Sequence, residues 1–331
     1  MGKISNSINH YLSDNRRFAD LFNGICFRGE TVIRAEDLLE GSQVYHETIG
    51  EIRQKERGTK RREHIRDICK LLKSGETLRV LALENQQMID YTMPLRCMQY
   101  DVMEYGKQLD ALKKKNKSEN RLDGIAEKMC GVKRTDRLVP VYTLCLYHGM
   151  DQWDGPRTLS DMMSFEGGKD SFRKIFKDYP MQLYCLNEAQ DLQVFHTELG
   201  ILFQALQYRK DRVGLRKLTM QDARYRHLDA DTLETMSVML ELPSIWKERK
   251  KYMEKSDDGE VYDMCQAVRE WAEEERSIGR TEGRREGVDE KTHTIVRNML
   301  SRSMSDEDIM AIAECSQEFI DKVRTSLRTP L

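Results

Sequence analysis

The chain has 331 residues, of which 39% are hydrophobic and 33% are charged, and its formal net charge is −2. No apolar run reaches the roughly 18–20 residues that a membrane span requires, so we expect no membrane segment. The eight cysteines show no C-x-x-C spacing and most lie in apolar segments, which argues against disulfides or a zinc site and is typical of reduced thiols. Because residues 1–18 lack the apolar stretch of a signal peptide, we expect a cytoplasmic protein.

Hydrophobic spacing predicts the elements of the first third of the chain. Residues 16–28 carry apolar side chains at helical intervals, and residues 43–49 indicate a first strand. A β-hairpin is expected next, with one strand within 63–72 and the other within 77–85. The four residues 73–76 (KSGE) supply its turn.

A long amphipathic helix is expected after the hairpin. Thr92 is a suitable N-cap and Pro94 lies in the first turn, where its missing N–H costs nothing. Apolar side chains then recur every three or four residues up to lysines near 113–117, as a helix dipole favours. The remaining periodic segments are a buried strand at 138–148, a weaker strand at 181–186, and helices at about 190–208 and 230–241. Strands that alternate with helices predict an α/β fold with a mixed sheet covered by helices.

Composition divides the chain into three parts. Residues 1–245 carry the strand and helix pattern and form the expected main domain. Residues 246–290 are charged throughout, and glycines at every fourth position from 279 to 287 fit either a loosely held helix or a flexible linker. Residues 291–331 regain an apolar rhythm, which predicts a small helical tail, either helix-turn-helix-like or a simple helical hairpin. Any homo-oligomer is expected to form through these C-terminal helices.

The predicted hairpin carries two acidic side chains, Asp67 and Glu84, whose spacing predicts that they lie on the same face. With a four-residue turn at 73–76, Asp67 lies opposite Ala82 and Glu84 is its diagonal neighbour on the same face, roughly 7–8 Å away at the backbone. Gln86, two residues further on, projects to the same side. Two carboxylates on one face of a rigid element can hold a divalent ion such as Mg²⁺. Such an ion activates water for phosphodiester hydrolysis.

Each of these residues also has a simpler interpretation. Asp67 and Glu84 could be ordinary strand-edge charges, although the apolar run VLALEN makes a charge at Glu84 costly unless it is paired or bound. His148, after a predicted buried strand, could act as a general base, but a turn-capping or core histidine is the more common case. Asp20 in the first helix could be a further metal ligand or a plain helix-surface charge.

Basic residues cluster in the segment 53–64 (RQKERGTKRREH), directly before the strand that carries Asp67. From this position we expect Lys60, Arg61 and Arg62 to flank the site and to contact DNA phosphates. The alternative is a solvated surface, which is the usual role of a short charged run.

Three segments resemble one known family. They are RREHIRDICKLLKSGETLRVLALENQQMIDYTMPLRCMQYDVMEYGKQL, RLVPVYTLCLYHGMDQWDGPRTLSDMM and VFHTELGILFQALQYRKDRVGLRKL. The chain thereby resembles the Rpn family of recombination-promoting nucleases, also described as YhgA-like putative transposases, which belongs to the PD-(D/E)XK nuclease superfamily. The resemblance implies the helix-strand-strand-strand-helix-strand core of that superfamily.

The resemblance also implies roles for individual residues. Asp67 stands at the motif aspartate and Glu84 at the motif glutamate, so both are the expected metal ligands. Gln86 stands where many relatives have lysine, and Rpn-like members commonly have this glutamine. The implied activity is that of an endonuclease that depends on Mg²⁺, or on Mn²⁺ or Ca²⁺, cuts DNA with low sequence specificity and acts in recombination or in mobile elements.

Two other functions fit the same sequence. Gln86 cannot act as a general base, and the net charge is close to zero, so the chain could be a catalytically degenerate nuclease relative that binds DNA or a protein. It could also be an interaction protein whose charged tail mediates oligomers.

Overall fold

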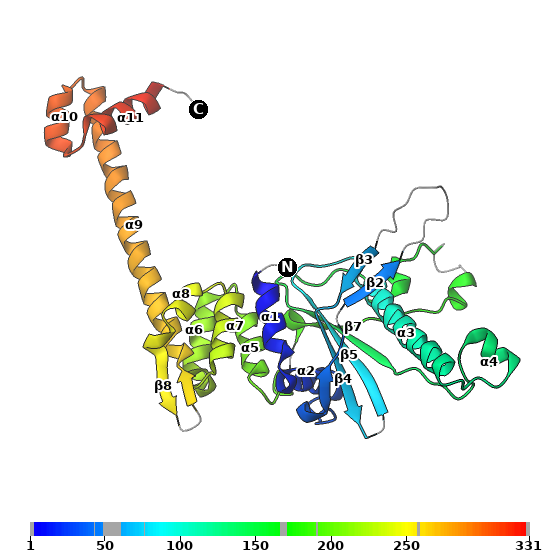
Figure 1. Cartoon of the computed structure of the whole chain (residues 1–331). Helices are drawn as coiled ribbons and strands as arrows, with labels where there is room; N and C mark the ends of the chain where they lie inside the picture. The colour runs from blue at the N-terminus through cyan, green and yellow to red at the C-terminus, as the bar shows by residue number, and fades with distance from the viewer. Residues whose placement is uncertain are drawn as a thin grey trace. The chain divides into compact units, whose positions relative to one another are not determined.

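Five strands form the central sheet of the protein, and helices pack on both of its faces (Figure 1). The computed structural model describes residues 3–42, 44–48, 61–75, 77–165, 171–189, 191–256 and 259–328. The chain forms two compact units, Met1–Cys265 and Gln266–Leu331, and the sheet belongs to the first. The expected α/β class, with a mixed sheet, flanking helices and a helical C-terminal region, is confirmed.

The sheet has the order β1-β4-β5-β6-β7. Its strands are β1 (Leu38–Glu40), β4 (Ile68–Ser74), β5 (Thr77–Gln86), β6 (Val141–Tyr147) and β7 (Gln182–Cys185). The first three are antiparallel, whereas β5, β6 and β7 run parallel. Side chains from Val80 to Leu83 in the middle of β5 are all buried, as the continuous apolar run of a central strand requires.

The helices of the first unit fall on both sides of this sheet. They are α1 (Lys3–Ser13), α2 (Asn15–Phe27), α3 (Met93–Ser118), α4 (Ile125–Cys130), α5 (Leu199–Gln207), α6 (Arg212–Gln221), α7 (Ala230–Met239) and α8 (Pro243–Lys247). Short 3₁₀ segments occur at Ala35–Asp37, Leu159–Met162, Ser171–Lys174, Leu186–Glu188, Ala223–Arg226 and Arg249–Tyr252. The order α2, β1, β4, β5, α3, β6 follows the expected sequence of elements, with an additional strand pair inserted after β1.

Two hydrogen bonds show that α1 and α3 lie on opposite faces. Lys70 of β4 donates to the main-chain oxygen of Ser13 at the end of α1 (2.7 Å). Thr143 of β6 donates to Asp101 of α3 (2.6 Å). The strand partners of Lys70 and Thr143 are consecutive residues of β5, and consecutive residues of a strand point to opposite faces.

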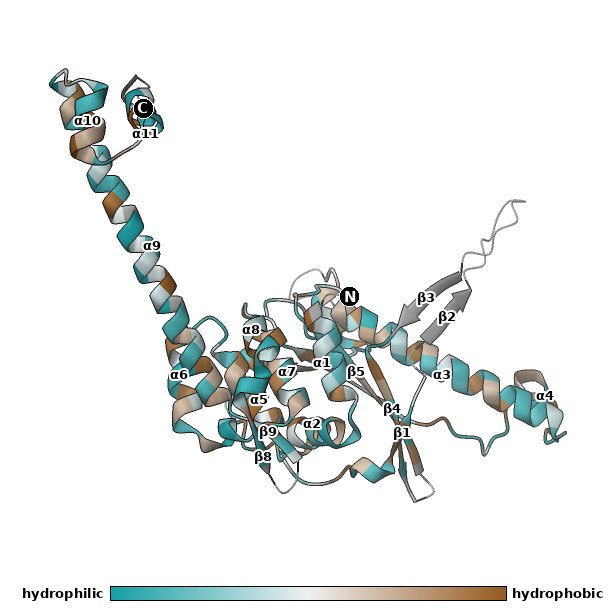
Figure 2. Cartoon of the chain, turned by 60° about the vertical axis from the view of Figure 1, so that its left-hand side comes forward, coloured by the Kyte–Doolittle hydropathy of each residue, from teal (hydrophilic) through white to brown (hydrophobic). Residues whose placement is uncertain are grey.

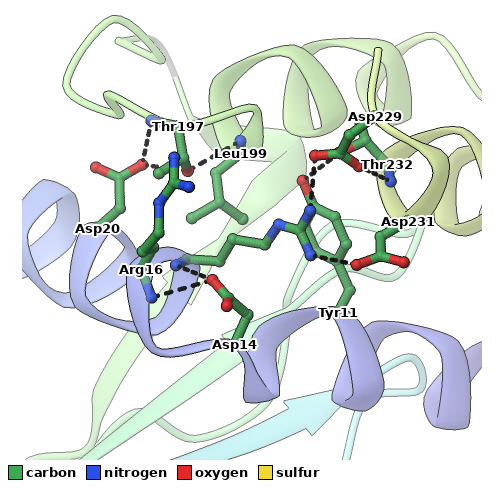
Figure 3. Close-up of polar contacts among 10 residues, drawn as sticks. Tyr11, Asp14, Arg16, Asp20, Thr197, Leu199, Asp229, Asp231 and Thr232 are labelled. Atoms are coloured by element: carbon green, nitrogen blue, oxygen red, sulfur yellow. Dashed lines mark hydrogen bonds and ion pairs between the residues drawn. The ribbon is translucent and has the colours of Figure 1, made fainter. Parts of the chain in front are cut away.

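α1 was not predicted from the sequence, and its contacts explain why it folds. The Arg17 guanidinium at the start of α2 lies over the Tyr11 ring of α1 (4.0 Å) and pairs with Asp229 (2.7 Å) and Asp231 (3.2 Å) at the start of α7. The Tyr11 hydroxyl is bonded to Thr232 of the same helix (2.9 Å; Figure 3). Tertiary packing on α7 therefore stabilises a helix of only 11 residues, which is too short to be stable alone.

The hairpin between β4 and β5 is tighter than predicted. Ser74 pairs with Thr77, so two residues rather than four separate the strands, and Gly75 has a φ of +61° that favours glycine. The expected register was wrong because it assumed the longer turn: Cys69, not Asp67, lies opposite Ala82. A shift of two residues leaves the paired side chains on their predicted faces.

The predicted strand at 63–72 is divided into two. Its first part, β3 (Arg61–Ile65), pairs with β2 (Val44–Thr48) in a separate two-stranded sheet. Its second part is β4, and Arg66 and Asp67 lie in the break between them. The predicted strand at 43–49 is thus present as β2, but it does not belong to the central sheet. Its place there is taken by the three-residue β1.

The other predictions for the first unit are confirmed with shifted ends. The helix expected at 16–28 is α2, the long helix after Thr92 is α3, the strands at 138–148 and 181–186 are β6 and β7, and the helix at 230–241 is α7. The helix expected at 190–208 starts later, at Leu199. A Cβ at Gly200 would approach the main-chain oxygen of Leu192 to 2.8 Å, so the preceding loop packs directly on the start of α5.

The C-terminal region is helical as expected, but its boundaries differ. Residues 246–265 belong to the first unit and include β8 (Met253–Ser256) and β9 (Gly259–Tyr262). α9 (Met264–Ser301) runs without interruption through the three glycines, so this stretch is a helix and not a flexible linker. Most of α9 is hydrophilic in Figure 2.

The second unit ends in a small helical cluster. α10 (Asp306–Ala313) and α11 (Gln317–Arg328) follow α9. Ser305 caps α10 as predicted, since its hydroxyl accepts from the Asp308 N–H (3.2 Å). Val296, Ile309, Ile320 and Val323 form the core of the cluster. In the described part of the chain, no helix combines the length and the apolar character needed to span a membrane.

The β8–β9 hairpin sets the C-terminal end of a stable first unit. Leu228 and Tyr262 exchange two main-chain hydrogen bonds (3.1 and 2.9 Å), and both Tyr252 and Tyr262 are buried. A chain that ends at residue 265 should therefore melt at least about 10 °C above one that ends at 245, because the shorter chain loses two buried aromatic side chains. Thermal unfolding followed by circular dichroism measures the difference, and equal melting temperatures would restore the boundary at 245.

Candidate active site

Glu84 is a fully buried carboxyl group at the carboxyl end of β5. It is 0% exposed, and one oxygen, Oε2, accepts from Arg96 of α3 (3.1 Å). The other oxygen, Oε1, has no hydrogen-bond partner among the described residues. Burial, together with the negative charge of Asp67, raises the pKa of Glu84 to about 8, against the opposing effect of Arg96 and Arg66.

Asp67 lies in the break before β4, and both of its oxygens are bonded. The main-chain N–H of Asn85 donates to Oδ2 (2.8 Å), and the Asn9 amide of α1 donates to Oδ1 (3.0 Å). The side chains of Asn9 and Asn85 are also bonded to each other. Asp67 therefore accepts a main-chain hydrogen bond from β5 beyond the last residue pair between β4 and β5. Its position is set by α1 and β5 together.

The two carboxyl groups meet at the end of β5 in a way that the sequence did not predict. Glu84 points to the α3 side, where Arg96 donates to it, while its neighbour Asn85 points to the α1 side. Asp67 reaches the backbone between them and acts electrostatically on Glu84. The carboxyl groups are thus neighbours around the strand end rather than a diagonal pair on one face.

Gln86 occupies the last position of β5. By strand alternation its side chain projects to the same side as Glu84, and it is half-buried. Its main-chain oxygen accepts from the N–H of His148 (2.9 Å), which ties the strand end to the turn after β6. His148 is buried on the other side of the sheet, beside α5, and so does not face Glu84.

A buried ion pair holds the break that positions Asp67. Arg66 is 0% exposed and donates to Asp101 of α3 (2.7 Å) and to Thr143 of β6 (2.9 Å). Asp101 also accepts from Thr143 (2.6 Å) and from the Tyr179 hydroxyl (2.6 Å). Because the side chain of Arg66 is fixed from both sides, the chain must turn at this point. The importance of this arginine was not predicted from the sequence, where its place next to Asp67 is the one signal for it.

Asp20 does not join the site. Its buried carboxylate accepts from the N–H groups of His196 (2.9 Å) and Thr197 (2.8 Å) and from the Thr197 hydroxyl (2.6 Å; Figure 3). Within the described ranges, no three His, Cys, Asp or Glu side chains form a group that could hold a metal ion. Asp20 is therefore a buried anchor between α2 and the loop before α5, and not a surface charge.

The predicted DNA-binding residues are only partly visible. Lys60 lies outside the described residues. Arg61 and Arg62 belong to β3, where their main chain pairs with Thr48 and Glu47 of β2. β3 leads directly into the break at Asp67, so the basic segment does precede the site along the chain.

Asp67 and Glu84 fit a divalent ion with oxygen ligands. Magnesium is commonly held by one or two carboxylates, with water and substrate phosphate completing its shell. The buried Oε1 atom of Glu84 has no partner among the described residues, and a cation would supply one and relieve the repulsion from Asp67. Arg96 now offsets part of the Glu84 charge, so it competes with a metal ion for this carboxyl group.

Comparison of the chain with protein-family models, with curated proteins and with solved structures finds no match. What the site can do is therefore inferred from its own side chains.

The raised pKa of Glu84 predicts a specific dependence of stability on pH. Its stabilising effect on the folded state is complete below the pKa of the unfolded carboxyl, near about 4.3, and is lost as the pH rises through 8. Without metal, the free energy of unfolding of the native protein should therefore fall relative to that of Glu84→Gln by several kcal/mol between about pH 5 and pH 9.

Chemical denaturation across this pH range in a chelating buffer measures the difference. Glu234→Gln, at an exposed position of α7, is the matched control and should follow the native curve. Parallel curves for the native protein and Glu84→Gln would mean that Glu84 ionises normally.

Proposed function

We propose that this chain is a metal-dependent endonuclease that hydrolyses phosphodiester bonds in DNA with low sequence specificity. The observation that carries the proposal is the coupled pair of Asp67 and Glu84, in which one buried oxygen of Glu84 has no partner among the described residues. A buried carboxyl oxygen without a hydrogen-bond partner is costly, and strongly shifted pKa values are enriched at functional sites. The role in recombination or in mobile elements rests on the resemblance to the Rpn family.

The order of elements supports the same proposal. α2, β1, β4, β5, α3 and β6 follow the helix-strand-strand-strand-helix-strand order that the resemblance implies. The two motif acids lie on either side of the hairpin, at the end of β5 and directly before β4. A PD-(D/E)XK nuclease core is therefore the fold that we propose for the first unit.

Each side chain of the site has a role in this proposal. Asp67 is held rigid by Asn9 and Asn85, so it is preorganised as a ligand. Glu84 must lose its proton to become a ligand. A metal ion that took the place of Arg96 on Glu84 would leave the guanidinium free to face an anionic phosphate. Gln86 can orient a water molecule but cannot take its proton. When bound, Mg²⁺ would activate the attacking water and stabilise the charge that develops on the phosphate.

A second function is favoured by the ion pair between Arg96 and Glu84. An arginine that already neutralises the motif glutamate, together with Gln86 in place of a basic residue, would suit a degenerate relative that binds DNA or protein without cutting. In that case Glu84 and Arg96 are a structural pair, and no metal ion displaces the arginine.

Cleavage of supercoiled plasmid separates the two functions. The native protein should nick or linearise DNA with Mg²⁺ or Mn²⁺ and not with a chelator. Asp67→Asn and Glu84→Gln should each reduce the rate at least about a hundredfold, because each removes a charged ligand. Glu234→Gln should cut at the native rate. DNA binding without cleavage by the native protein under any of these ions would favour the degenerate relative.

The basic segment before β3 should supply phosphate contacts. Replacing Lys60, Arg61 and Arg62 with alanine should weaken DNA binding and flatten its salt dependence, since each lost phosphate contact reduces the slope of log K against log [salt] by about 0.9. Fluorescence anisotropy with a labelled duplex at several salt concentrations measures both quantities. Alanine at Lys113, Lys114 and Lys115, at the end of α3, makes the same change in charge and is the control. If the two triple variants change the DNA affinity and the slope equally, residues 60–62 are a solvated surface and not a specific phosphate-binding segment.

A further inference from the structure

His148 is a buried histidine whose ring has no partner among the described residues. It follows β6 and is 2% exposed, and neither Nδ1 nor Nε2 has a hydrogen bond there. The turn after His148 is closely packed, because a Cβ at Gly149 would lie 2.4 Å from the main-chain oxygen of Gln87. Burial, and then the charge of Arg209, lower the pKa of His148 to about 4. The neutral ring thus presents a donor and an acceptor that are both unused, at a cost to stability.

Arg209 lies in the turn after α5 and also has buried polar atoms without a hydrogen-bond partner among the described residues. Its Nη1 atom donates to the main-chain oxygen of His148 (3.3 Å), which places the two residues together. Its Nε and Nη2 atoms are buried and have no hydrogen-bond partner within the described ranges. Nε and Nη2 are the two donors of one edge of the guanidinium, and this edge binds two oxygens of a carboxylate or a phosphate side by side.

Among the described residues, no acidic side chain accepts a hydrogen bond from Nε or Nη2 of Arg209. Glu241 raises the pKa of Arg209 through its charge, but Glu241 is exposed, and burial still lowers the pKa of Arg209 overall. Asp151 pairs with the neighbouring Lys210 (3.8 Å). A buried guanidinium is stable only when its donors are satisfied, so the arrangement calls for an anion that has two oxygens.

We propose that the buried, unpartnered edge of Arg209 and the ring of His148 form a binding site for a small oxyanion. Phosphate, free or as the phosphoryl group of a small molecule, is the fitting chemistry, since it offers paired oxygens to the arginine and a further oxygen to the histidine. The donors are buried, which favours a compact ligand over a nucleic-acid strand. The site lies beside α5, on the side of the sheet away from Glu84, and does not depend on the proposed nuclease function.

Binding of inorganic phosphate to the full chain tests the proposal. Phosphate is titrated against chloride at constant ionic strength, in a chelating buffer that removes any metal from Asp67 and Glu84. Melting temperature and isothermal titration calorimetry are measured together. The native protein should show a saturable rise in melting temperature, because a ligand that binds the folded state stabilises it.

Three variants locate the binding. Arg209→Lys keeps the charge but removes the paired donors, so the affinity for phosphate should fall at least about tenfold. His148→Gln should weaken it in the same direction. Lys210→Gln removes the adjacent cation, which contacts only Asp151 in the described part of the chain, and should change the affinity by less than about twofold. Melting in chloride alone confirms that each variant is folded.

The outcomes are distinct. Saturable stabilisation that Arg209→Lys loses and Lys210→Gln keeps supports the site. No saturable effect in the native protein, or an equal effect in Arg209→Lys, overturns it and leaves buried water as the partner of both side chains. A single-stranded oligonucleotide provides the second arm. If the oligonucleotide binds through Arg209 and inorganic phosphate does not, the small oxyanion is refuted in favour of a nucleic-acid phosphate.

Discussion

The buried pair of Arg66 and Asp101 is the interaction on which the rest of the candidate site depends. The Arg66 guanidinium reaches from the break before β4 to α3 and β6. This one side chain therefore fixes where β3 ends, where β4 starts and how α3 lies on the sheet. Taking both charges out of water costs several kcal/mol, which the bonds from Thr143 and Tyr179 to Asp101 help to offset. α3 carries Arg96 and the break carries Asp67. A cooperative buried network of this kind therefore sets the geometry of both carboxyl groups.

Most of the sheet could be predicted from the sequence, because its central strands and α3 have strong periodic patterns. The break at Arg66 could not, since the apolar pattern continues on both sides of it and only the tertiary contacts of the arginine force the turn. The register error had a local cause: KSGE permits a four-residue turn, and only the backbone at Gly75 shows that two residues suffice. Asp67 and Glu84 were identified from their spacing and the family resemblance. Asn9 was missed because α1 was missed, and Arg96 because its partner lies on another element.

Glu84 shows how a candidate site and stability oppose each other. Its Oε1 atom is buried and has no hydrogen-bond partner in the described part of the chain, which weakens the folded state at neutral pH. An apolar residue at this position would extend the run from Val80 to Leu83 at lower cost. Arg96 relieves part of that cost, yet it is about one-third exposed and also contacts Asp90 (3.3 Å). It is therefore a partner that can leave. In a permanent structural ion pair we expect a fully buried arginine, as Arg66 is. The partial exposure of Arg96 instead fits an arginine that a bound cation can displace from Glu84.

The carboxyl ends of β5 and β6 place Glu84 and His148, two of the buried residues with atoms that lack a hydrogen-bond partner among the described residues, at neighbouring strand ends but on opposite faces. Glu84 faces α3, and His148 faces α5, with Gln86 between them because its main-chain oxygen accepts the His148 N–H. In open α/β sheets, ligands gather at the carboxyl ends of parallel strands, where loops and helix ends leave polar groups exposed. A ligand on Arg209 would lie beside the turn at His148 and Gly149, because Arg209 donates to the His148 main-chain oxygen. One main-chain hydrogen bond, from His148 to Gln86, therefore connects the turn beside Arg209 to the strand end that carries Glu84 and Gln86.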